Sequence, residues 1–151
     1  MAIDSPAAAG AGTQAKLIAK KYNLLYLDTG KIYRYIGNLK IKNKRDFTYS
    51  FIKKKIKKIK LSDLNNLELL NDRVATEASL VAKDIKIRKI VKNFQLKCAN
   101  FPPKKFNGSV LDGRDITSVI MKNAKVKFYI TASLEVRAKR RFIEFKKLKK
   151  K

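Results

Sequence analysis

The stretch of small residues near the N-terminus constrains the fold of this chain more than any other feature. An apolar start, residues 1–4, precedes it, and residues 14–22 follow with apolar side chains spaced for one face of a helix. A strand, a small-residue loop and a helix in this order are typical of a phosphate-binding loop. Backbone N–H groups of small residues can surround phosphate oxygens, and the helix N-terminus favours an anion. The loop consists of Ser5, Pro6, Ala7, Ala8, Ala9, Gly10, Ala11, Gly12 and Thr13.

This loop departs from the usual phosphate-binding pattern at two positions. The pattern has glycine where this chain has Ser5, and lysine where it has Ala11. Thr13 stands where the pattern places a Mg²⁺-binding hydroxyl. By its pattern, the stretch is a phosphate loop that lacks its cation. Taken alone, such a stretch is more often a glycine- and alanine-rich turn before a helix.

Length and composition favour one globular domain. The 151 residues are 45% hydrophobic, which suffices for a core and argues against disorder. The single cysteine, Cys98, permits no internal disulfide, and one cysteine with 0 histidines argues against a zinc site. No apolar run approaches the ~18 residues of a membrane span, and no secretion signal is present. We expect a soluble, cytoplasmic protein without a membrane partner.

The net charge of +25 suits either a nucleic-acid binder or an enzyme with an anionic substrate. The basic residues are mostly lysines spread along the chain, without an arginine-rich arm. We therefore expect no specific nucleic-acid partner. Residues 39–60 form a basic segment in which Ile52, Ile56 and Ile59 have helical spacing, although their β-branched side chains leave a strand open.

Polar residues follow several further predicted strands. The apolar run 24–27 ends in Asp28-Thr29-Gly30, where we expect Thr29 to cap the next helix. Residues 109–111 predict a strand that ends in Asp112, the position of a Mg²⁺-associated carboxylate. Residues 126–130 predict another strand, and Ser133 an N-cap for a final helix. Two helices, 71–83 and 85–98, are expected between these strands.

Four blocks occur in order along the chain: Ala2-Ile3-Asp4 with Pro6, Gly10 and Gly12-Thr13; Leu25 to Gly30 with Tyr33-Arg34; Leu111 to Asp115; and Thr131 to Ser133 with Glu135 to Arg141. Together these blocks resemble the cytidylate kinases, bacterial enzymes that phosphorylate CMP and dCMP. The resemblance implies an α/β nucleoside monophosphate kinase fold, with a parallel sheet flanked by helices and a helical nucleotide-binding insertion. Residues 1–151 would form this single domain, and residues 38–100 approximately its CMP-binding insertion.

The resemblance also implies roles for individual residues, with ATP and Mg²⁺ as cofactors. The loop from Ser5 to Thr13 would bind the ATP phosphates, with Arg137 and Arg141 facing ATP. Mg²⁺ would be held by Thr13 and, through water, by Asp112. Catalysis would depend on Arg114, Asp112 and Arg141. The residues implied for CMP are Thr29, Arg34, Arg88, Arg114 and Asp115.

Two departures from the family lead us to expect weak activity. Ala11 replaces the lysine that contacts the transferred phosphoryl group, and the chain stops short of the family's C-terminal part. We expect a monomer if the protein is complete, and impaired transfer to CMP or dCMP in this truncated form. The alternative is a non-catalytic nucleotide- or RNA-binding protein derived from the kinase fold.

Overall fold

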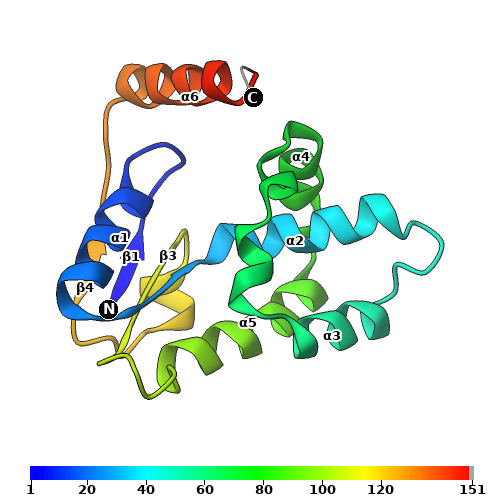
Figure 1. The fold of residues 1–151 in the computed structure, drawn as a ribbon, viewed down its shortest axis with the longest axis horizontal. Coiled ribbons are helices and arrows are strands. Elements are labelled where there is room, and N and C mark those ends of the chain that lie inside the picture. Colours follow the sequence, from blue (N-terminus) through cyan, green and yellow to red (C-terminus); the bar gives the residue numbers. More distant parts are fainter. Residues whose placement is uncertain (150–151) are drawn as a thin grey trace. The chain divides into compact units, whose positions relative to one another are not determined.

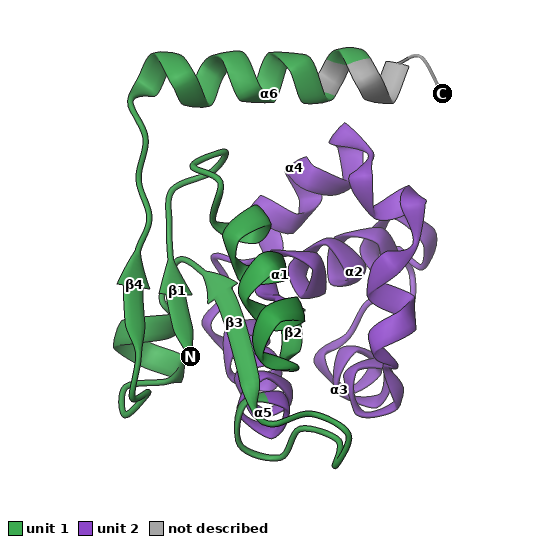
Figure 2. Ribbon diagram, turned by 60° about the vertical axis from the view of Figure 1, so that its left-hand side comes forward, with its two compact units in different colours: residues 1–27, 99–151 green, residues 28–98 purple. Residues whose placement is uncertain are grey.

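The computed structural model describes residues 1–149, which divide into two compact units (Figure 2). One unit comprises Met1–Leu27 and the chain from Ala99 onward, and the other comprises Asp28–Cys98. The expected domain 1–151 includes Lys150 and Lys151, which lie outside the described residues. The insertion boundaries 38–100 stay a prediction.

A four-stranded parallel sheet forms the centre of the first unit (Figures 1 and 2). The strand order is β2-β3-β1-β4, and β1 pairs in parallel with β3 and β4. Each strand is short and ends near a polar residue, as the sequence predicts for strands whose carboxyl ends carry a site. The strands are β1 (Ala2–Asp4), β2 (Leu25–Asp28), β3 (Ser109–Gly113) and β4 (Lys127–Tyr129).

Helix α1 (Ala11–Tyr22) packs on this sheet through small side chains. Its alanines at positions 11, 15 and 19 are buried with Ile3 and Val110 in one core cluster. The helix begins at Ala11, three positions before the expected start at Gln14, because Gly10 takes the left-handed conformation (φ 101°) and acts as its N-cap. The predicted α/β fold is thus confirmed, with the loop directly joined to this helix.

The second unit is helical. Its basic segment forms helix α3 (Tyr49–Lys58), with Ile52 and Ile56 buried, so the alternative of a strand is wrong. Two short 3₁₀ helices, η1 and η2, follow α3. The elements are α2 (Thr29–Lys42), α3, η1 (Leu61–Asn65), η2 (Leu67–Leu70), α4 (Asp72–Val81) and α5 (Ile85–Asn100). None of the helices among residues 1–149 is long and apolar enough to cross a membrane.

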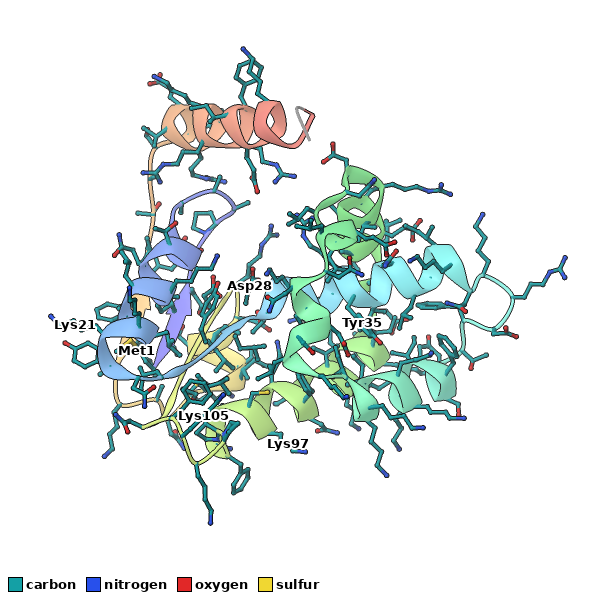
Figure 3. The ribbon with its side chains drawn as sticks, in the orientation of Figure 1. Met1, Lys21, Asp28, Tyr35, Lys97 and Lys105 are labelled. Carbon is teal, nitrogen blue, oxygen red and sulfur yellow. The ribbon has the colours of Figure 1, made fainter. Side chains whose placement is uncertain are left out.

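Aspartates cap two helices of this unit. The expected cap Thr29 is wrong: Thr29 is the first helical residue, and Asp28 Oδ1 accepts from Lys31 N at 3.2 Å (Figure 3 labels Asp28). Asp84 Oδ1 accepts from the backbone N–H groups of Lys86 (2.8 Å) and Ile87 (3.1 Å) at the start of α5. The bond from Ile87 N–H is the largest cause that lowers the pKa of Asp84.

Helix α6 (Leu134–Lys149) completes the first unit. Ser133 Oγ accepts from Val136 N at 3.4 Å, as predicted for the N-cap. Before it, a single π-helical turn, η3 (Ile116–Ile120), follows β3. Helix α6 bonds to the loop between β1 and α1, and η3 bonds to Asp4 at the end of β1.

Candidate functional site

The loop between β1 and α1 is held by backbone hydrogen bonds at both ends. At its start, Ser5 N donates to Gly113 O at 2.9 Å, which ties the loop to the end of β3. At its end, Thr13 N (3.1 Å) and Gln14 N (3.2 Å) donate to Gly10 O and close the first turn of α1. The loop is therefore fixed on a strand end and a helix N-terminus, the placement that suits a phosphate site.

Ala8 is the one strained backbone position described in this loop. It has φ 60°, in the left-handed region that costs a residue with a Cβ roughly 1–2 kcal/mol. Sequence reasoning did not single it out, because alanine differs little from its neighbours in size and polarity. The strain shows that the loop's path is imposed by its anchors rather than by local preference.

The variant Ala8→Gly is expected to stabilise the chain by about 0.5–1 kcal/mol. Glycine adopts positive φ freely, and this relief exceeds the extra entropy that glycine has in the unfolded chain. Urea unfolding followed by circular dichroism measures the difference. Ala7→Gly is the matched control, because Ala7 has no positive φ, and it should be neutral or destabilising.

Asp112 lies beside the start of α1. A Cβ placed on Gly12 would be 3.5 Å from Asp112 Oδ2 and 3.3 Å from the hydroxyl of Tyr26, so glycine keeps this approach open. Asp112 is buried, at 9% exposure, near the end of β3, and Thr13 follows Gly12 directly in α1. The structure thus brings the predicted carboxylate next to the helix turn that carries the predicted hydroxyl.

A cavity of about 320 Å³ opens beside the loop. Its cationic lining comes from Arg114, which follows β3, and from Arg137 of α6. Two guanidinium groups and the loop in one cavity make an environment that favours a multiply charged anion such as a phosphate ester. The lining residues are Ser5, Pro6, Ala7, Arg114, Tyr129 and Arg137.

Arginines of α6 bond to the loop's carbonyl groups. Arg137 Nε donates to Ala7 O at 2.9 Å. Arg140 Nη1 donates to Ala9 O at 2.8 Å and, less closely, to Ala8 O at 3.4 Å. Arg141, expected to face ATP, donates through Nη1 to Glu144 Oε2 of its own helix at 2.8 Å. Sequence reasoning assigned no role to Arg140, because the i, i+4 spacing favoured Arg141 as the residue that shares a helix face with Arg137.

The other residues implied for the second nucleotide lie mostly in the helical unit. Thr29 is buried at the start of α2. Arg34 Nη1 donates to Leu69 O at 2.8 Å, and Arg88 Nη1 donates to Ala82 O at 3.2 Å. Asp115 belongs to the first unit, at the start of η3. Their assignment to CMP stays a prediction.

The described residues contain no group of three or more histidine, cysteine, aspartate or glutamate side chains that could hold a metal ion. Mg²⁺ does not need such a group, because it commonly binds through one or two carboxylates, waters and the phosphates of a substrate. Asp112 supplies one carboxylate, and Thr13 in the neighbouring turn of α1 supplies one hydroxyl. These donors fit Mg²⁺ that arrives with a nucleotide.

Comparisons with known proteins identify the family of this chain. The family model described as cytidylate kinase matches residues 1–151. Proteins named cytidylate kinase are similar: one from Rhodospirillum rubrum is 38% identical over 147 residues, covering 97% of this chain and 69% of its own length. Another, from Bartonella bacilliformis, is 41% identical over 150 residues, covering 97% and 67%. The chain spans about two thirds of the length of these relatives.

Proposed function

This chain belongs to the cytidylate kinase family, and we propose that it transfers a phosphoryl group from ATP to CMP or dCMP. The observation that carries the proposal is the cavity lined by the loop residues Ser5 to Ala7 together with Arg114 and Arg137. It combines residues of the loop with two guanidinium groups, and such groups bind and neutralise phosphates.

The reaction needs positioning and charge neutralisation more than acid or base catalysis. The bond from the γ-phosphorus of ATP to the bridging oxygen breaks as a bond forms to a phosphate oxygen of CMP, giving ADP and CDP. That oxygen is already anionic, so no base has to remove a proton. The loop would hold the ATP phosphates, while Arg114 and Arg137 would offset the charge of the groups brought together.

Mg²⁺ would be held by Thr13 and, through water, by Asp112. Its chemistry, when bound, is to neutralise the phosphate oxygens of ATP. The burial of Asp112 at the end of β3 fixes the direction of its carboxylate. A fixed carboxylate is preorganised for this role, because it does not have to reorient when a nucleotide enters.

Ala11 lowers the rate in this proposal. It is 4% exposed within the core cluster beneath the loop, and a methyl group there offers phosphate no donor. We therefore propose binding of both nucleotides with slow transfer. A cytoplasmic location, a monomeric state and the lack of a nucleic-acid partner stay predictions.

Calorimetric titration with CMP and with ATP tests the proposal. We expect the wild-type chain to bind both nucleotides, and Arg114→Ala to weaken CMP binding about 10- to 100-fold, the usual effect of losing a charged hydrogen bond. Lys122→Ala is the matched control: this exposed residue of the same unit also carries one positive charge, and its loss should change affinity less than twofold.

Two results would contradict the proposal. One is a wild-type chain that binds neither nucleotide at millimolar concentration. The other is equal CMP affinity for Arg114→Ala and Lys122→Ala, which would place the acceptor site elsewhere. Detection of CDP when both nucleotides are present would establish the transfer itself.

A further inference from the structure

The loop from Ser5 to Thr13 has no cationic side chain of its own. A loop that binds the phosphates of ATP has to offset several negative charges, and backbone dipoles supply only part of this. A cation from elsewhere in the chain is therefore needed next to the loop. The inference below rests on the proposed function and concerns which residue provides that cation.

The guanidinium group of Arg140 lies at the start of α1. Its Nη1 atom is 2.8 Å from Ala9 O and 3.4 Å from Ala8 O. The same atom lies 3.3 Å from where a Cβ on Gly10 would be. Gly10 is the N-cap of α1 and the residue directly before Ala11. The cation is thus beside the position where the loop itself lacks one.

We propose that Arg140 supplies the cationic donor for the ATP phosphates that Ala11 does not provide. Both carbonyl bonds use Nη1, whereas Nε and Nη2 of a guanidinium carry three further N–H groups. A guanidinium can bind phosphate oxygens in a bidentate manner. Glycine at position 10 leaves room for the guanidinium group of Arg140, because a side chain there would be strained by the positive φ and would crowd Nη1.

The neighbouring arginines Arg137 and Arg141 make different contacts. Arg137 donates through Nε to Ala7 O and lines the cavity that also contains Arg114. Arg141 Nη1 is paired with Glu144, which reduces the net charge it presents. Arg140 is the arginine placed next to Gly10, at the end of the loop that leads into α1.

The test measures ATP affinity by calorimetry at low salt, using the full chain. We expect Arg140→Ala to weaken ATP binding about 10- to 100-fold and AMP binding less than threefold, because AMP lacks the outer phosphates. The matched control is Lys139→Ala, which removes one positive charge from an exposed neighbouring position and should change ATP affinity less than twofold. Thermal unfolding of each variant checks that it is folded.

A double-mutant cycle with Ala11→Lys separates the charge of Arg140 from its bonds to the loop. If Arg140 substitutes for a lysine at position 11, the lysine should improve ATP affinity at least fivefold more in the Arg140→Ala background than in the wild-type background. If Arg140 only holds the loop through its hydrogen bonds to the carbonyl groups, a lysine at position 11 cannot replace those bonds. The improvement in ATP affinity from the lysine should then be the same in both backgrounds.

The outcomes are distinct. Weaker ATP binding in Arg140→Ala together with the unequal gains supports the inference. Equal ATP affinity of Arg140→Ala and Lys139→Ala, equal gains from the lysine, or an equal loss for AMP and ATP overturns it while leaving the proposed function intact. A wild-type chain that does not bind ATP overturns the inference and the proposed function together, whether or not it binds CMP.

Discussion

Replacing Ala11 by lysine is expected to raise the rate of CDP formation about 10- to 100-fold. A preorganised donor at a site of developing charge is worth ~10²–10³ in rate. Because Arg140 Nη1 already lies next to Gly10, part of that effect is present in the wild-type chain. Steady-state assays with ATP and CMP, at saturating concentrations of both, measure the gain.

The buried setting of position 11 determines the control for this experiment. Ala11 belongs to the core cluster with Ile3, Ala15, Ala19 and Val110, so a longer side chain must direct its stem along the loop to reach solvent. Ala11→Met introduces a side chain of similar length without the charge. It should show the same small change in melting temperature as Ala11→Lys but no gain in rate.

An equal rate for the lysine and methionine variants would contradict this prediction. It would mean that the missing charge does not limit transfer. A rate gain in both variants would instead point to the shape of the loop, and Ala8, with its φ of 60°, would be the next residue to vary. Variants at positions 11 and 8 of the same loop therefore separate the two explanations.

The sequence was sufficient to predict the elements around the site but not their contacts. Short apolar runs ending in Asp4, Asp28 and Asp112 predicted strands whose ends share one edge of a sheet, and these strands are present. Each of these patterns lies within a short stretch of residues, so it can be recognised from a single sequence. The start of α1 was placed too late, because the small residues at its start resemble a loop.

The contacts that were missed depend on geometry between distant positions. Arg140 and Arg141 are adjacent and identical, yet one bonds to Ala9 O and the other to Glu144. Which of two neighbouring arginines meets the loop depends on the rotation of α6, which no local pattern encodes. Likewise, Asp28 rather than Thr29 caps α2, because the helix begins at Thr29, one residue earlier than a cap at Thr29 would allow.

Asp4→Ala is expected to reduce the free energy of unfolding by about 3–5 kcal/mol, a large part of the ~5–15 kcal/mol typical of a domain. The Asp4 carboxylate is 5% exposed and accepts from Ile116 N (2.6 Å), Thr117 N (3.0 Å) and the hydroxyl of Thr117. Removing it leaves these buried or partly buried donors without their acceptor, which costs more than an ordinary hydrogen bond.

The same carboxylate connects the stability of the fold to the geometry of the site. Asp4 ends β1 directly before the loop, whereas Ile116 and Thr117 follow the turn that carries Arg114. Its hydrogen bonds therefore fix the distance between the loop and that turn. Loss of these bonds should loosen η3 and weaken CMP binding even at temperatures at which the variant remains folded.

Urea unfolding and amide hydrogen exchange measure the two effects. Asp46→Ala, at an exposed turn of the helical unit, is the control and should change stability by less than about 0.5 kcal/mol. In Asp4→Ala, the amides of Ile116 and Thr117 should exchange faster, while amides of α4 should not. Unchanged exchange at Ile116 and Thr117 would show that Asp4 does not hold η3, and that Arg114 depends on other contacts for its position.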